Sequence, residues 1–133
     1  MKLYTITLFA LISLLACQNA KNTKASEAPE SFESFNRRFH EDSLFQLSRI
    51  NFPIEGKLID GSEQQEWTPN NWEMLKEPVR KDVDTTAYQH RLTTTDTTVY
   101  ERFWIENSGF SVERRYKRID GKWYLTLYHD VNL

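Results

Sequence analysis

Four polar side chains in the C-terminal half of the chain could do acid–base chemistry. They are His90, Glu101, Arg114 and His129. A carboxylate beside an arginine and two imidazoles would shift the pKa values of the group, and one imidazole could then act as a general base. The alternative interpretation is structural: an Arg114–Glu101 ion pair across two strands, with the histidines at the rim of a pocket. We favour the structural interpretation, although the sequence is compatible with both.

Motifs of several familiar enzyme classes are missing from the sequence. It contains no Gly-rich phosphate loop, no Gly-x-Ser-x-Gly and no His-Glu-x-x-His. The three histidines, His40, His90 and His129, are scattered along the chain, which is a weak pattern for metal ligation. We therefore expect no metal site and no cofactor, and the sequence names no substrate.

Alternation of residue types after Thr86 predicts the four strands that would position these side chains. The alternating residues are Tyr88, His90 and Leu92; Val99, Glu101, Phe103 and Ile105; Phe110, Val112, Arg114 and Tyr116; and Trp123, Leu125, Leu127, His129 and Val131. Alternate residues of a strand share a face, so the polar four would face inward together with Leu92, Phe103, Val112 and Leu125. A slip of one residue in any strand would invert its face.

Short turn signals separate the predicted strands. Thr95-Asp96, Asn107-Ser108-Gly109 and Asp120-Gly121 stand between them. Asp-Gly readily takes the positive φ that a type I′ turn requires, so Asp120-Gly121 predicts a tight hairpin. Consecutive hairpins indicate an antiparallel meander.

The opposite face of this sheet would carry aromatic and basic side chains. They are Tyr100, Trp104, Tyr124 and Tyr128, with Arg102 and Arg115. Aromatic residues and arginine are enriched in protein interfaces, so this face could bind a second copy or another protein. Alternatively, residues 62–84, with Trp67 and Trp72, could cover these rings.

Helix signals come before the strands. Ser31 is a plausible N-cap, and Phe32, Phe35 and Phe39 fall on one helical stripe. A second short helix is predicted after Asp42. Helices followed by strands indicate an α+β domain, with the phenylalanine stripe packed across one face of a curved antiparallel sheet.

The middle of the chain gives weaker signals. Residues 52–59 predict one extended segment, closed by an Asp60-Gly61 turn. Residues 62–84 are polar and irregular, with a possible helical turn from Trp72 to Lys76.

Cys17 is the only cysteine of the chain and follows an uncharged run from Leu3 to Ala16. The run is shorter than the roughly 20 residues that cross a bilayer as a helix, and it has the length of a signal-peptide core. Leu14-Leu15-Ala16-Cys17 resembles the lipobox at which bacterial lipoproteins are cleaved and acylated on cysteine. Plain secretion and a buried N-terminal helix are the alternatives.

The lipobox interpretation divides the chain into three parts. Residues 1–16 are a signal peptide, 17–30 are the lipidated cysteine and a flexible tether without large apolar residues, and 31–133 are one α+β domain. The membrane would then be a partner, reached through Cys17. Because Gln18 is not aspartate, sorting rules for such lipoproteins favour the outer membrane.

The composition limits the partners and the covalent chemistry. The chain has 17 Lys and Arg against 19 Asp and Glu, a net charge of −2, without the basic excess of a nucleic-acid binder. With Cys17 acylated no thiol is left for a disulfide. We therefore expect no nucleic-acid partner and a domain held together by its aromatic core.

A longer pattern at the start of the domain resembles a known family. Phe32-x-x-Phe35-x-x-x-Phe39-x-x-Asp42-x-x-Phe45-Gln46-x-Ser48-Arg49-Ile50-x-Phe52-Pro53 is similar to the opening of a bacterial lipoprotein family of unknown function, domain of unknown function 4348. The resemblance implies an envelope location and a cone like nuclear transport factor 2 (cystatin-like), with helices in a bent antiparallel sheet. It implies no activity.

These observations favour a membrane-anchored envelope lipoprotein whose domain binds a small molecule or a protein without catalysis. The alternative is a small hydrolase or isomerase that uses His129 or His90 with Glu101 in a concave pocket. A third interpretation is a structural envelope component without a pocket.

Overall fold

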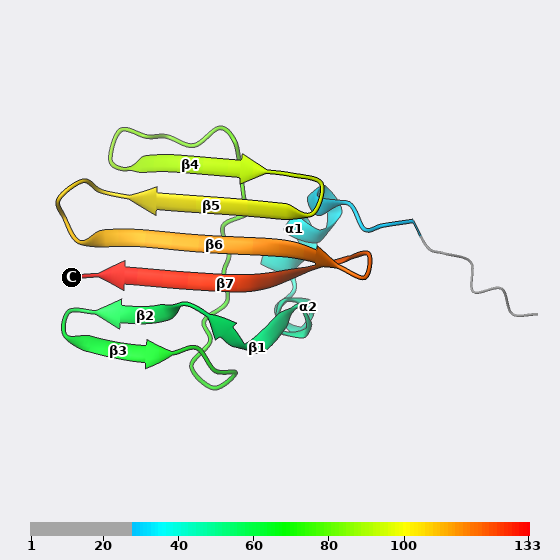
Figure 1. Cartoon of the computed structure of the whole chain (residues 1–133), viewed down its shortest axis with the longest axis horizontal. Helices are drawn as coiled ribbons and strands as arrows, with labels where there is room; N and C mark the ends of the chain where they lie inside the picture. Colours follow the sequence, from blue (N-terminus) through cyan, green and yellow to red (C-terminus); the bar gives the residue numbers. More distant parts are fainter. Residues whose placement is uncertain (1–27) are drawn as a thin grey trace, which may run out of the picture.

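The computed structural model describes residues 28–133 (Figure 1). Two short helices come first. α1 spans Phe32–Glu41 and α2 spans Ser43–Ser48. Their predicted N-caps are confirmed, because Ser31 Oγ accepts a hydrogen bond from the Ser34 amide at 3.2 Å and Asp42 Oδ1 accepts one from the Phe45 amide at 2.9 Å. No described helix is long and apolar enough to span a bilayer.

Seven strands form one sheet. They are β1 Ile50–Glu55, β2 Lys57–Asp60, β3 Glu63–Glu66, β4 Gln89–Thr94, β5 Thr98–Trp104, β6 Phe110–Ile119 and β7 Lys122–Asn132. Their order is β3-β2-β7-β6-β5-β4, and β1 also pairs with β7. The predicted meander of β4 to β7 is confirmed. However, β1 and β2 run parallel to β7, so the sheet is mixed and not wholly antiparallel as expected.

Residues with positive φ mark the turns. At the predicted type I′ hairpin Asp120 has φ 49° and Gly121 has φ 79°. The extended segment that was predicted over residues 52–59 is interrupted at Gly56, which has φ 98°. A Cβ at Gly56 would lie 2.1 Å from the carbonyl oxygen of Tyr128, so only glycine lets the chain pass from β1 to β2 here.

Residues 67–88 form a strap without helix or strand that runs across one face of the sheet (Figure 1). The helical turn predicted from Trp72 to Lys76 is absent from it, and the short strand β3 just before it was not predicted. Side-chain amides hold the strap to the helices. Gln46 Nε2 donates to Leu75 O at 2.9 Å, and Asn36 exchanges two 3.0 Å hydrogen bonds with the backbone of Val79.

The core lies between α1 and the inner face of the sheet. Phe35, Phe39, Tyr116 and Leu125 are buried there, and the ring centroids of Phe39 and Tyr116 lie 5.6 Å apart. The predicted phenylalanine stripe therefore packs on the sheet as expected. A second aromatic group joins this core, with Trp67 and Trp72 of the strap and Tyr128 of β7 in mutual contact.

An irregularity in β7 inverts the face of its C-terminal half. Tyr116 pairs with Leu125, but the next residue towards the start of β6, Arg115, pairs with Leu127, so Thr126 is extra. Such a β-bulge shifts the alternation by one residue. Tyr128, predicted on the outer face, is therefore buried in the core, and His129, predicted to face inward, lies on the outer face.

The outer face of the sheet keeps the other predicted residues. Its rings are Tyr100, Trp104 and Tyr124, each partly exposed. The helices and the strap lie on the opposite side (Figure 1), so the alternative that residues 62–84 cover this face is wrong for these three rings. Trp67 and Trp72 do contact the fourth ring, Tyr128, but on the inner face. Arg102 lies over the Trp104 ring at 5.1 Å, and Tyr100 donates to Glu113 at 2.8 Å.

Glu30, the last residue of the predicted tether, is bound to the domain. Its carboxylate accepts from Arg49 Nη1 at 2.8 Å and from the Trp123 amide at 2.9 Å, while its own amide donates to Gly121 O at 2.8 Å. The chain thus joins the domain at the β6–β7 hairpin, at one end of the sheet (Figure 1).

Candidate ligand-binding cavity

A cavity of about 710 Å³ lies between the inner face of the sheet and the strap. Its volume is in the range of small-molecule sites, about 300–1,000 Å³. The apolar part of the wall includes Leu58, Trp67, Met74, Leu75, Pro78, Val83, Tyr88, Phe103, Phe110, Val112 and Tyr128. The polar part includes Asn71, Glu73, Lys76, Glu77, Arg80, Glu101, Arg114 and Asp130.

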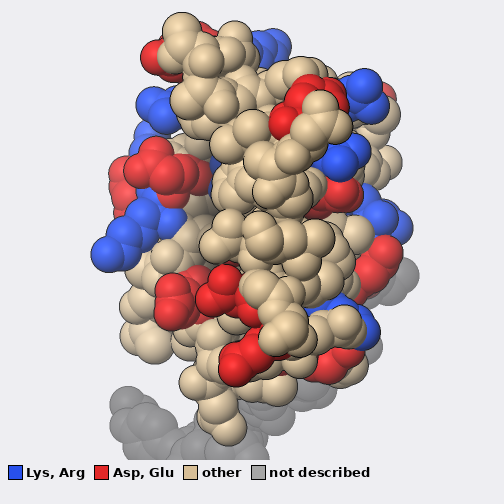
Figure 2. Space-filling model, turned by 90° about the vertical axis from the view of Figure 1, so that its left-hand side faces the viewer, with Lys and Arg blue, Asp and Glu red and all other residues tan. Residues whose placement is uncertain are grey.

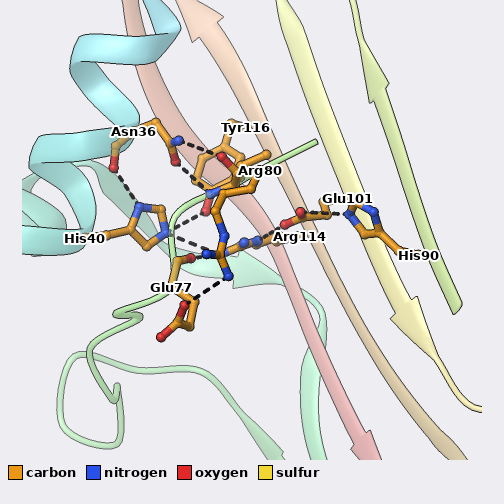
Figure 3. Close-up of polar contacts among 9 residues, drawn as sticks. Asn36, His40, Glu77, Arg80, His90, Glu101, Arg114 and Tyr116 are labelled. Carbon is orange, nitrogen blue, oxygen red and sulfur yellow. Dashed lines mark hydrogen bonds and ion pairs between the residues drawn. The ribbon is translucent and has the colours of Figure 1, made fainter. Parts of the chain in front are cut away.

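A chain of buried polar side chains passes through the inner wall of this cavity (Figure 3). Glu101 and Arg114 line the cavity, whereas His90 and His40 at the two ends of the chain do not. His90 Nε2 lies 3.0 Å from Glu101 Oε1, and Glu101 Oε2 accepts from Arg114 Nε. Arg114 Nη1 donates to His40 Nε2 at 3.2 Å and to the carbonyl oxygen of Glu77 at 2.7 Å. Each partner in the chain therefore fixes the position of the next, from β4 through β5 and β6 to α1.

Strand register explains why three of these residues meet. Glu101 of β5 pairs with Arg114 of β6, and Leu92 of β4 pairs with Glu101, which puts His90 two residues away on the same face. The alternation in the sequence predicted this grouping. The Arg114–Glu101 ion pair is present, with side-chain exposures of 7% and 0%.

His129 does not belong to the cluster, contrary to the prediction. The bulge at Thr126 turns it to the outer face, where it lies opposite Glu113 in the β6–β7 ladder. There it lines a separate, smaller hollow together with Glu55 and Leu127. Its inward place is taken by Tyr128 and Asp130, which line the cavity.

His40 completes the chain and was missed as a site residue. It is 4% exposed, and its Nδ1 lies 2.7 Å from the Asn36 carbonyl oxygen one turn earlier in α1. That carbonyl can only accept, so Nδ1 carries the proton and Nε2 accepts from Arg114. The only signal in the sequence was its place directly after Phe39 on the buried side of the predicted helix.

Burial changes the pKa values of the inner groups. It raises the pKa of the fully buried Tyr116 to about 12, and it also raises the pKa of Tyr128, with help from the charge of Asp130. The pKa of Asp130 is raised by burial and by the charges of Asp60 and Glu73. Figure 2 shows the end of the molecule where the C-terminus lies in Figure 1. Acidic side chains gather over the lower half of this view, where β2 and β3 lie.

Metal binding finds no support in residues 28–133, where no group of three His, Cys, Asp or Glu side chains could hold an ion. Cys17, the predicted lipidation site, lies outside the residues that the structure describes.

Comparisons with known proteins place the chain in a family. Residues 30–132 match a protein-family model that carries the description "-like". The chain belongs to that family. The NMR structure of a protein from Bacteroides uniformis ATCC 8492 is 27% identical, with a TM-score of 0.55, over 75% of this chain and 76% of that chain. None of the curated proteins matches.

These comparisons support the fold but name no activity for the family. The match to the Bacteroides uniformis structure covers most of both chains, so the mixed α+β fold is shared with a bacterial protein.

We expect the buried imidazole of His40 to make the domain sensitive to acid. Burial, with a smaller contribution from the charge of Arg114, lowers its pKa from the ordinary 6.5 to about 4. Between these values the unfolded chain binds more protons than the folded one, so stability falls as the pH decreases. We expect this group to contribute a loss of about 3 kcal/mol between pH 7 and pH 4.

Urea unfolding at several pH values, followed by tryptophan fluorescence, measures this loss. His40→Gln removes the titrating group, so its stability should fall less steeply than that of the wild type over the same range. His129→Gln, on the outer face, is the matched control and should keep the wild-type slope. Parallel curves for the wild type and His40→Gln would show that His40 is not the acid-sensitive group.

Proposed function

We propose that this protein is a bacterial envelope lipoprotein, anchored through an acylated Cys17, whose domain binds a small molecule or a protein partner without catalysis. The observation that carries the binding part of this proposal is the cavity of about 710 Å³ under the strap, with apolar and aromatic walls and a few fixed polar groups. The lipobox-like residues before Cys17 carry the anchoring part.

The arrangement of the buried chain favours binding over catalysis. Both oxygens of Glu101 already have partners, His90 on one side and Arg114 on the other. His90 stacks on Phe103, with ring centroids 4.6 Å apart, and it is not part of the cavity wall. A general base must reach the proton that it removes, and His90 lies outside the wall, so of this pair only Glu101 lines the cavity, with both of its oxygens already bonded.

A small hydrolase or isomerase is the second candidate, because the His90–Glu101 hydrogen bond of 3.0 Å is the acid–base pair that such an enzyme needs. Hydrolysis of 4-nitrophenyl esters by the wild type and by His90→Asn separates the two. A rate for the wild type above buffer that His90→Asn abolishes would favour the enzyme. Equal rates of ester hydrolysis for the wild type and His90→Asn would favour the binding function.

The family assignment is proposed more narrowly as the lipoprotein family domain of unknown function 4348, with a cone like nuclear transport factor 2. The packing of α1 on the inner face of the sheet supports this proposal.

The outer face, with Tyr100, Trp104 and Tyr124, is the proposed surface for a second copy or another protein. Light scattering on the purified chain reports its oligomeric state.

The direction in which the cavity faces follows from the point where the chain enters the domain. Glu30 is bonded at the β6–β7 hairpin, whereas Phe110 at the opposite end of β6 lines the cavity. At roughly 3.3 Å per residue the ends of β6 lie about 30 Å apart. The cavity wall therefore reaches the end of the sheet away from the point where the chain from Cys17 enters the domain, which would leave that end free to take a ligand from the surrounding fluid.

Labelling with radioactive palmitate in bacteria tests the anchor. The wild-type chain should incorporate label and sediment with membranes, and Cys17→Ala should do neither, because it is the only cysteine. Label that persists in Cys17→Ala, or wild-type protein that stays in the soluble fraction, would contradict the lipoprotein proposal.

A further inference from the structure

Arg114 has a donor that the buried chain does not use. Its Nε donates to Glu101, and its Nη1 donates to His40 and to Glu77 O. No hydrogen bond within residues 28–133 involves Nη2. Every fully buried side-chain nitrogen and oxygen in that part of the chain has a partner, so Nη2, which has none, is not fully buried. Arg114 is part of the cavity wall. Nη2 is therefore open to the cavity.

The guanidinium is held rigidly for recognition. Arg114 is only 6% exposed, and its neighbours on β5, α1 and the strap fix its plane. A planar donor that is already ordered loses little entropy when it binds an anionic oxygen, and such charge-assisted hydrogen bonds are the strong ones. The open edge of Arg114 is therefore suited to a ligand oxygen.

The other charges of the wall limit the charge of the ligand. Glu101 is neutralised by Arg114, and the Glu77 carboxylate lies 3.7 Å from Arg80 Nη2. The remaining charged groups are Lys76, Glu73 and Asp130. The wall therefore has three basic side chains against four acidic ones and no excess positive charge for a doubly charged phosphate. A single carboxylate would rely on the unused Nη2 donor of Arg114 rather than on an excess of positive charge.

We propose that the cavity takes a monocarboxylate with an apolar, aromatic-sized body. Its carboxylate would accept from Arg114 Nη2, and its body would lie against Phe103, Phe110, Val112 and Tyr128, which line the same cavity. This inference rests on the proposed small-molecule function and adds the chemical class of the ligand.

Titration calorimetry with 4-phenylbutanoate and its uncharged analogue 4-phenylbutanamide tests the proposal. The full chain is used in the form that cells produce. A lipidated chain is measured in nanodiscs, and empty nanodiscs are titrated as the blank. The wild type should bind the acid about tenfold or more tightly than the amide, as expected for one charge-assisted hydrogen bond. This comparison needs no variant and does not depend on the stability of a mutant.

Two arginine variants locate the effect. Arg114→Lys keeps the charge but lacks the planar fork, and it should reduce the preference for the acid to less than threefold. Arg115→Lys, one residue along on the outer face, should keep the wild-type preference. Equal affinity of the wild type for acid and amide would overturn the carboxylate assignment and leave small-molecule binding intact. If neither compound bound, that result would count against the small-molecule function and the carboxylate assignment together.

Discussion

Replacing Glu101 by alanine is expected to lower the free energy of unfolding by about 3–5 kcal/mol, because it leaves a buried charge without its partner. Glu101 is 1% exposed and contacts both Arg114 and His90. In the variant the Arg114 guanidinium stays buried against His40 and Glu77 O without a counter-ion. Urea denaturation followed by tryptophan fluorescence measures the loss.

Glu113→Ala is the matched control, since it removes a carboxylate from the neighbouring strand on the outer face. Its ion pair with Arg102 is 3.5 Å long, with side-chain exposures of 39% for Arg102 and 26% for Glu113, so we expect a loss below about 1 kcal/mol. Adding Arg114→Met to Glu101→Ala should recover part of the stability, because no charge is then buried. If Glu101→Ala cost no more than Glu113→Ala, the buried chain would not stabilise the cavity wall.

Gln46→Leu is expected to cost about 3 kcal/mol, because it leaves several buried polar groups without partners. The Gln46 amide donates to Phe39 O at 2.6 Å and to Leu75 O at 2.9 Å, and it accepts from Trp72 Nε1 at 3.0 Å and Leu75 N at 2.9 Å. Leucine has a similar volume but none of these hydrogen bonds. The strap, which forms one wall of the cavity, should loosen first.

Hydrogen exchange resolves where this loosening occurs. In Gln46→Leu the Leu75 amide should exchange faster, whereas amides between β6 and β7 should change only with global stability. Gln64→Leu, in the exposed strand β3, should leave both unchanged. Uniform faster exchange throughout the Gln46→Leu domain would show that Gln46 supports the whole core and not the strap in particular.

Local rules predicted the parts of the fold that local sequence controls. Ser31 and Asp42 cap the helices because their short side chains reach the backbone amides of the first turn. Asp120-Gly121 forms the hairpin because both residues accept positive φ. The alternation in β4, β5 and β6 was sufficient to bring His90, Glu101 and Arg114 to one face.

The features that the sequence did not predict depend on contacts between distant segments. The bulge at Thr126 leaves no mark in the alternation of Leu125, Leu127 and His129, so the face of β7 was inverted in the prediction. The strap has no periodicity, because its place is set by hydrogen bonds from Gln46 and Asn36. His40 was missed for the same reason, since its partner Arg114 lies 74 residues away in the sequence.

Native mass spectrometry of the full chain, isolated from its own cells, tests the central claim that the cavity under the strap binds a small molecule. The wild type should carry an additional mass of a few hundred daltons that is released on denaturation. Val112→Trp, which fills the cavity from β6, should lack that mass while keeping the far-UV circular dichroism of the wild type. A wild-type chain that carries no bound molecule, or a molecule that Val112→Trp retains equally, would contradict the account.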